Sequence, residues 1–257
     1  MNVKQAAFVF ATGIAFLCTW CAPGPFSRES LAAPPPSAYG ESPQALGDIL
    51  KKTESTYQEI RAFTAYFRQW TTSAVANAMA TEASGKLYYQ KPRQMRWEYE
   101  KPEAQVFVVN QQLAWLHVPS EHQIALYDSK HFFSSPLAQT FFDGMVELKK
   151  NFEVNLDSRQ TTKTAAVLKL IPRTEDPTIK TLYLWIELPS HRIATIESHD
   201  ALGNINRIVL DSLQPTSHLD SKLFELSIPP STMVTDTEGR ELAAPEIESL
   251  KQRLLTH

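Results

Sequence analysis

The sequence ASGKLYYQKPRQMRWEYEKPEAQVFVV, residues 83–109, is the stretch that decides the fold. Within it Met95, Trp97 and Tyr99 alternate strictly with charged residues. Because successive side chains of a strand point to opposite faces, three large apolar groups share one face of this strand. The pattern predicts a half-buried β-strand.

Further short segments on both sides have the composition of strands, and loops of a few residues separate many of them. Such connections favour antiparallel neighbours. The segments that we expect to be strands are residues 85–90, 94–100, 105–109, 113–118, 123–127, 165–171, 181–188, 192–198 and 205–210.

Three segments have helical periodicity instead. Residues 43–60 form a predicted amphipathic helix, and residues 134–146 form a second one that interrupts the strands. A curved sheet with helices on its open side is an α+β fold, which we describe as an incomplete antiparallel β-barrel, or half-barrel, with a helical lid. It spans residues 43–236, and residues 237–257 form a helical tail that either docks on the body or binds a partner.

The N-terminus has the pattern of an export signal. A basic start precedes an uncharged stretch, residues 5–22, and small residues before Ala33 suit cleavage after Ala32. We expect a signal peptide over residues 1–32 and a proline-rich linker over residues 33–42; an uncleaved anchor is the alternative. Cys18 and Cys21 lie inside the apolar stretch, so their spacing indicates neither a redox nor a metal site.

Composition and motifs exclude several functions. With 25 basic and 28 acidic side chains the net charge is −3, which gives no global field for nucleic acid. The eight glycines form neither a P-loop nor a dinucleotide fingerprint, and the histidines form no zinc-protease motif. We therefore expect no enzyme activity, no cofactor, no metal and no nucleic-acid partner.

The block from Ala83 to Pro119 resembles the periplasmic outer-membrane lipoprotein carrier family, LolA. The shared pattern is a glycine-led strand, a basic residue before proline, an aromatic strand, a second proline, and then a strand, a turn and a tryptophan strand. Residues 63–69 look like the family's first strand, and residues 223–234 look like its closing segment. The resemblance covers about residues 43–236.

This resemblance implies a half-barrel of the LolA/LolB type whose apolar cavity receives the acyl chains of lipoproteins. It also implies a monomeric periplasmic carrier that accepts them from an inner-membrane ABC transporter and delivers them to an outer-membrane receptor. A regulator of the same fold that senses lipid or protein in the envelope is the alternative. The residues that could line the cavity are Phe67, Leu87, Tyr89, Met95, Trp97, Tyr99, Phe107, Val109 and Trp115; an ordinary sealed core is the alternative for them.

The resemblance also assigns a lid and a latch. Leu46, Ile49 and Leu50 of the first helix, with Leu137 and Phe141 of the second, would cover the cavity. The family has a basic residue, usually arginine, that fastens the lid to helix carbonyl groups, and this chain has Lys91 there. Lysine offers three donors on a flexible stem, so we expect a looser latch, which Arg93 or Arg96 could share.

Overall fold

The structure is a computed structural model that describes residues 43–74, 80–133, 145–176 and 178–255. Within these residues the strands form one twelve-stranded sheet in the order β12-β6-β5-β4-β3-β2-β1-β11-β10-β9-β8-β7. The strands are β1 Ala62–Thr72, β2 Ala80–Gln90, β3 Gln94–Lys101, β4 Gln105–Val109, β5 Leu113–Val118, β6 Gln123–Asp128, β7 Phe152–Leu156, β8 Ala165–Pro172, β9 Thr181–Glu187, β10 Arg192–His199, β11 Ile205–Thr216 and β12 Met233–Thr235. The helices are α2 Pro43–Glu59, α3 Ser129–Phe133, α5 Met145–Asn151 and α6 Ala244–Leu255, with the 3-10 turns η1 Pro119–Glu121 and η2 Ser221–Phe224.

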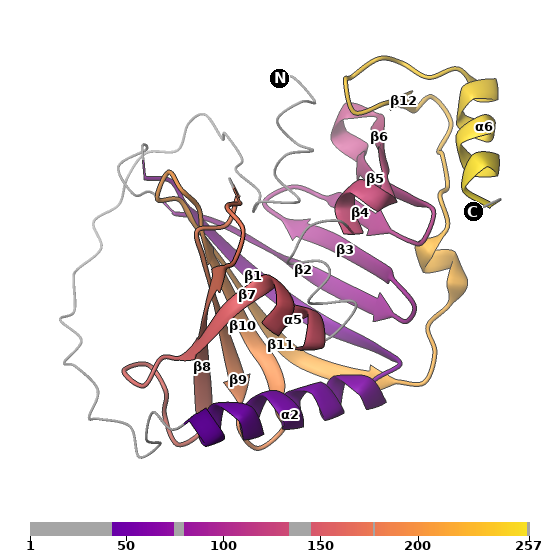
Figure 1. Cartoon of the computed structure of the whole chain (residues 1–257). Helices are drawn as coiled ribbons and strands as arrows, with labels where there is room; N and C mark the ends of the chain where they lie inside the picture. The colour runs from indigo at the N-terminus through magenta and orange to yellow at the C-terminus, as the bar shows by residue number, and fades with distance from the viewer. Residues whose placement is uncertain (1–42, 75–79, 134–144, 177, 256–257) are drawn as a thin grey trace.

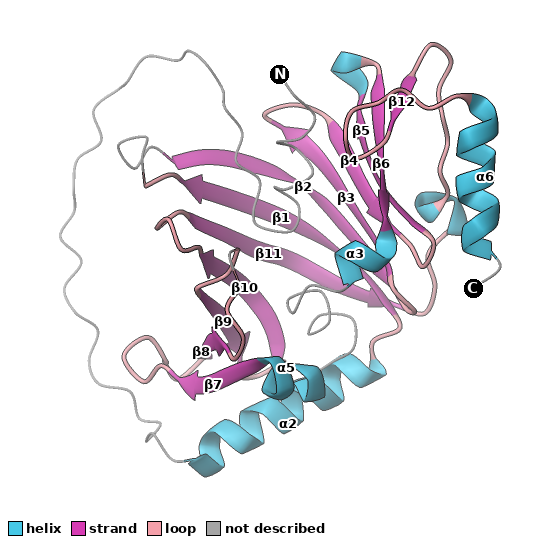
Figure 2. Ribbon diagram, turned by 45° about the horizontal axis from the view of Figure 1, so that its top comes forward, coloured by secondary structure: helices cyan, strands magenta, loops and turns pink. Residues whose placement is uncertain are grey.

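The sheet is open and strongly curved (Figure 2). Strand β1 lies near its centre and pairs antiparallel with both β2 and β11 over most of its length. The other ladders between neighbours are antiparallel too, except that β12 pairs parallel with β6. The predicted α+β half-barrel is thus an open, curved, mostly antiparallel sheet with few helices.

The helices divide between the two faces of the sheet. Helix α2 crosses one end of the strands beside α5, and α6 lies at the other side of the molecule, next to β12 (Figure 1). Helices α2, α3 and α5 pack on the concave face, and α6 packs on the convex face of β4–β6. Within the described ranges no helix has both the length and the apolar composition needed to cross a bilayer.

All nine predicted strands form, but β2 begins five residues earlier and β11 ends six residues later than expected, and two strands were missed. Strand β7 has only five residues, and β12 has three and is held by its pairing with β6. A three-residue segment such as β12 carries too few residues for its alternation to distinguish it from a loop, whereas β7 alternates apolar and polar residues and was overlooked. The signal peptide, the linker and most of the predicted helix over residues 134–146 lie outside the described residues.

Three apolar cores fill the spaces between these layers. One core lies on the concave face of β1–β5. The convex-face core lies between β4–β6 and the tail. The helix-side core lies between α2, α5 and β7–β10, and its buried members are Ile49, Leu50, Leu148, Phe152, Ala166, Leu168, Leu170, Ile179, Leu182, Leu184, Ile186 and Ile193. The buried members of the convex-face core are Val108, Leu113, Trp115, Ile124, Leu126, Phe224, Val234, Leu242 and Ile247.

The tail docks on the body of the protein. Leu242 and Ile247 are 6% and 7% exposed, and Leu250 packs against the same core. The turn before α6 is closed by Glu246, whose carboxylate accepts a hydrogen bond from the backbone N–H of Ala243 at 2.9 Å. Such a bond satisfies a free donor at the helix N-terminus and favours a carboxylate near the positive end of the helix.

Replacing Ile247 by alanine is expected to lower the free energy of unfolding by about 2–4 kcal/mol, because it leaves a cavity beneath α6. Urea denaturation followed by circular dichroism measures the change. The exposed neighbour Glu248 supplies the control, since Glu248→Ala is expected to change stability by about 0.5 kcal/mol or less. Equal stability of the two variants would show that α6 contributes no packing.

Candidate functional site

The concave face of β1–β5 forms a continuous apolar surface in three rungs that run across the strands. The first rung passes from Phe63 through Tyr89, Met95 and Val109 to Ala114. The second passes from Ala65 through Leu87, Trp97 and Phe107 to Leu116. The third passes from Phe67 through Gly85 to Tyr99. We call these residues, with Ile60 and Leu210, the aromatic wall.

The rings of the aromatic wall pack directly against one another. Phe67 makes edge-to-face contacts with Trp97 and Tyr99, with ring centres 4.7 and 4.9 Å apart. Gly85 makes this arrangement possible, because a side chain there would meet the Phe67 ring at 3.0 Å and the Glu98 carbonyl oxygen at 1.8 Å. The glycine therefore lets a phenylalanine ring occupy the space above its backbone.

Eight of the nine predicted cavity residues lie on this wall. Phe67, Leu87, Tyr89 and Val109 are at most 2% exposed, Phe107, Met95 and Tyr99 are slightly more exposed, and Trp97 is partly buried. Apart from Trp97, the wall is therefore closed to solvent in this conformation. A ligand could reach it only after the side chains that cover it have moved.

Trp115 was assigned to the wrong face. It pairs with Val108 and Leu126 and belongs to the convex-face core, beneath the tail. Strand β5 is apolar at nearly every position because both of its faces are buried, so no alternation indicates which face a residue takes. The register with β4 decides it: Leu116 pairs with Phe107 of the wall, and the neighbouring Trp115 points the other way.

Sequence reasoning missed four aromatic residues at this site. Phe63 lies at the start of the first rung and stacks on Tyr89 at 5.1 Å. Phe132 and Phe133 of α3 cover the wall, with Phe132 5.7 Å from Phe107. Tyr127 pairs with Ala114 and extends the first rung onto β6, where its buried hydroxyl has no hydrogen-bond partner in the described chain. Burial raises the pKa of Tyr127 to about 12.

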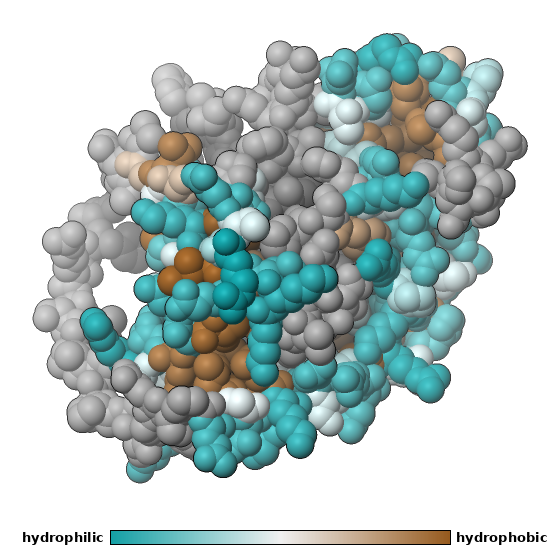
Figure 3. Space-filling model, viewed as in Figure 1, coloured by the Kyte–Doolittle hydropathy of each residue, from teal (hydrophilic) through white to brown (hydrophobic). Residues whose placement is uncertain are grey.

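The predicted lid helix contacts a different part of the concave face from the one expected. Leu46, Ile49 and Leu50 pack in the helix-side core, against residues of β8–β10 and α5. Figure 3 shows apolar side chains gathered just above α2, apart from those near β5 and β6. Of the described residues, Tyr57, near the end of α2, is the one that packs against both this core and the aromatic wall. Leu137 and Phe141 lie outside the described residues.

Lys91 lies at the C-terminal end of α2. Its Nζ donates hydrogen bonds to the carbonyl oxygens of Tyr57 at 2.7 Å and Gln58 at 3.2 Å. These carbonyls have no acceptor role within the helix, and the C-terminal end of a helix attracts cations. Helix α2 has no basic residue of its own in its last turn, so Lys91 supplies that charge from the β2–β3 turn.

The two arginines that could share the latch with Lys91 have different partners. Arg93 lies over the ring of Phe133, with its guanidinium carbon 5.0 Å from the ring centre. Arg96 is on the convex face, where it pairs with Glu98 at 2.6 Å and donates to the carbonyl oxygen of Leu223. Arg96 therefore fastens the segment after β11 and does not contact the lid helix through these bonds.

Helix α2 is also held by Tyr57. Its hydroxyl oxygen accepts a hydrogen bond from the backbone N–H of Ile193 at 3.1 Å, and burial raises its pKa to about 12. Both ends of the contact are thus polar groups removed from water, which favours one fixed position of the helix. Among the described residues no group of three or more His, Cys, Asp or Glu side chains could hold a metal ion.

Comparison with known proteins shows which family this chain belongs to. The model of the family described as outer membrane lipoprotein carrier protein LolA matches residues 58–227. The chain belongs to the LolA family. The match begins at the end of α2 and includes the whole aromatic wall, whereas β12 and α6 follow it.

Relatives of this LolA-family chain are distant. It is 26% identical over 183 residues to the outer-membrane lipoprotein carrier protein of Methylobacillus flagellatus, covering 71% of this chain and 86% of that one. It is 30% identical over 149 residues to that of Methylococcus capsulatus, covering 58% and 69%. A conserved protein from Thermus thermophilus has a similar structure, with a TM-score of 0.47, 14% identity and coverage of 75% of this chain and 99% of that one. The LolA family consists of carrier proteins and not of enzymes, as the sequence predicted.

Replacing Lys91 by methionine is expected to raise the rate of amide hydrogen exchange at the end of α2 about fivefold. The change removes two exposed charge-assisted bonds, worth about 1 kcal/mol after solvent screening. Hydrogen exchange with mass spectrometry of the 50–60 peptide measures it. Lys86→Met is the control, since Lys86 pairs with Glu100 and does not hold α2. Lys91→Arg is expected to slow exchange, because the guanidinium presents more donors; equal rates in all variants would contradict the contact.

Proposed function

We propose that this protein is a periplasmic carrier that binds the acyl chains of lipoproteins released from the inner membrane and delivers them to the outer membrane. Family membership supports a carrier, and the relatives described above are named lipoprotein carriers. The observation that carries the proposal is the aromatic wall, whose three rungs bring eight predicted lining residues together on one concave face.

The free-energy cost of exposing an acyl chain to water explains why such a carrier is needed. Exposing an acyl chain of about 16 carbons to water costs on the order of 12 kcal/mol, at roughly 0.8 kcal/mol for each CH₂ group. Free diffusion across an aqueous compartment is therefore negligible. A concave apolar surface removes that cost, and a cover that closes over it keeps the empty protein from exposing the same surface.

In this proposal the closed conformation is the empty carrier. Phe132 and Phe133 of α3 and Tyr57 of α2 are the described side chains that would have to move before an acyl chain reaches the wall. Lys91 would set how readily the end of α2 opens, and the helix-side core around Ile49 and Leu50 would hold its other half in place. Opening then displaces one end of the helix and not the whole of it.

The proposed partners follow from the transport of lipoproteins from the inner to the outer membrane. An inner-membrane lipoprotein-releasing ABC transporter would supply the acylated protein, and an outer-membrane receptor would accept it, with the carrier acting as a monomer. No covalent chemistry takes place on the carrier, so binding and release alone determine transport.

Mass spectrometry of the protein purified from its periplasm tests the proposal. The expected result is co-purified acylated lipoprotein, which passes to acceptor vesicles that contain the receptor. A protein that carries no acylated ligand would overturn the proposal. Ligand that binds and is never released would indicate a sensor instead of a carrier.

A further inference from the structure

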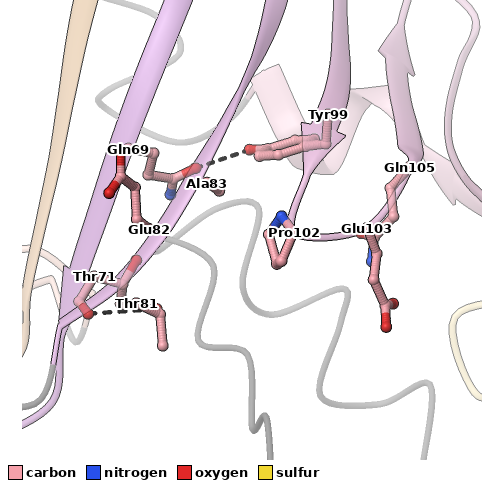
Figure 4. A pocket seen from close by; sticks show the side chains of 9 residues that line it. All are labelled: Gln69, Thr71, Thr81, Glu82, Ala83, Tyr99, Pro102, Glu103 and Gln105. Atoms are coloured by element: carbon pink, nitrogen blue, oxygen red, sulfur yellow. Dashed lines mark hydrogen bonds between the residues drawn. The ribbon is translucent and has the colours of Figure 1, made fainter. Parts of the chain in front are cut away.

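The concave face turns polar just beyond the third rung. Gln69 follows Phe67 by two residues on the same face of β1, and Gln105 pairs with Tyr99 on β4. Together with Glu82 and Glu103 they line a small pocket between β1–β2 and the β3–β4 turn (Figure 4). Its volume of about 40 Å³ has room for a few water-sized groups but not for an acyl chain.

We call this polar edge of the concave face, with its pocket, the rim. One part of the rim is fully hydrogen-bonded. The Tyr99 hydroxyl donates to Gln69 Oε1 at 3.0 Å, and Gln69 Nε2 donates to Asn206 Oδ1 at 2.7 Å. Gln69 is only 3% exposed, so both ends of its amide are held in a fixed orientation. This chain of bonds places a rigid polar boundary at the top of the aromatic wall.

The side-chain amide of Gln105, unlike that of Gln69, forms no hydrogen bond with the described residues. Gln105 is 8% exposed, yet its side chain has no hydrogen-bond partner in the part of the chain that the structure describes. Neither amide atom of Gln105 is a fully buried atom without a partner, so the amide is accessible from the pocket that it lines. An amide group that lines the pocket presents both a donor and an acceptor to a ligand there.

The charge of the rim restricts that ligand. Among the described residues, the pocket lining contains two carboxylates, those of Glu82 and Glu103, and no basic side chain. Carboxylates beside a site oppose a phosphate group through like-charge repulsion. An uncharged group with carbonyl acceptors meets no such penalty.

We infer that this rim binds the uncharged ester and amide junction between the acyl chains and the protein part of the ligand, with Gln105 as its hydrogen-bonding residue. The inference rests on the proposed function, because the chains themselves would lie on the aromatic wall below. Gln105 Nε2 would donate to a junction carbonyl, and the two carboxylates would disfavour phospholipids that carry the same acyl chains. The rim thus distinguishes lipoproteins from phospholipids by the junction between acyl chains and the polar part of the ligand. The length of the acyl chains cannot distinguish them, because both classes carry the same chains.

Binding of three probes to the full chain without residues 1–32 tests this inference. The probes are a synthetic dipalmitoylglyceryl-cysteinyl peptide, dipalmitoylphosphatidylglycerol and a pyrene-labelled alkane. The wild type is expected to bind the lipopeptide at least tenfold more tightly than the phospholipid. Gln105→Leu is expected to weaken lipopeptide binding about five- to tenfold and to leave alkane binding unchanged, whereas the exposed Gln214→Leu changes neither.

Two further measurements separate recognition from folding. Gln105→Leu is expected to have an unfolding temperature close to that of the wild type, because the Gln105 side chain forms no hydrogen bond with the described residues that the change would remove. The double variant Glu82→Gln with Glu103→Gln is expected to raise phospholipid affinity about three- to tenfold.

The probes also separate the two proposals. Alkane binding without discrimination, or equal loss for all probes in Gln105→Leu, would overturn the junction site and leave the carrier intact. A wild type that binds none of the probes would overturn the proposed function as well.

Discussion

Replacing Trp97 by glutamate is expected to weaken binding of a fluorescent 16-carbon acyl probe at least about 100-fold. Trp97 is the partly buried member of the second rung and lies edge-on to Phe67 at 4.7 Å. A charge there would face the alkyl chain without a partner, which costs several kcal/mol. About 2.7 kcal/mol already corresponds to a factor of 100 in the dissociation constant. Fluorescence titration measures the loss.

The chain offers a matched control for this variant. Trp185 is also a partly buried tryptophan on a strand, but it lies on the face of β9 opposite the helix-side core, with the guanidinium of Arg207 4.9 Å from its ring centre. Trp185→Glu is expected to change probe affinity by less than about threefold. If Trp97→Glu does not fold, Trp97→Gln introduces polarity without charge and is expected to weaken binding about tenfold. Normal binding by a folded Trp97 variant would show that the wall is only a structural core.

Replacing Gly85 by alanine is expected to lower the free energy of unfolding by about 4 kcal/mol or more. The added Cβ would lie 1.8 Å from the Glu98 carbonyl oxygen and 2.8 Å from its carbonyl carbon, so the β2–β3 backbone must shift. The register of this pair is already irregular between Ser84 and Gly85, and the backbone has no side-chain rotamer through which to relax. Urea denaturation of the variant and the wild type measures the difference.

Gly47 gives the opposite expectation and serves as the control. A Cβ at that position of α2 meets nothing within 4 Å, and alanine is the better helix former. Gly47→Ala is therefore expected to raise the free energy of unfolding by about 0.5–1 kcal/mol. Similar effects of the two glycine substitutions would contradict the close approach of β2 and β3.

The two apolar cores on the concave face give the lid helix two different functions. Its N-terminal half completes the helix-side core through Ile49 and Leu50, which are 5% and 3% exposed. Its C-terminal end is held by Lys91 and by the Tyr57 hydroxyl, through a few polar bonds. Because moving the first half would expose buried apolar surface, we expect the proposed lid helix to open most readily at the end that faces the aromatic wall.

The local patterns of the sequence determined most of the strands and the first helix. Alternation at Met95, Trp97 and Tyr99 predicted both the strand β3 and the face that these residues share, because a period of two assigns side chains to faces wherever polar residues alternate with apolar ones. Helical spacing predicted α2 to within one residue of its end. The glycine-led block also identified the family.

Only the tertiary structure decided the rest. The face of Trp115 depends on the register between β4 and β5 and on a tail about 130 residues away in the chain, which buries the second face of a strand that has no alternation. The contact of Lys91 with α2 and the position of Gln105 in a pocket beside β1 and β2 likewise depend on groups from distant segments. The periodicity of a segment indicates which of its faces is buried. Long-range packing decides which residues from distant segments bury that face.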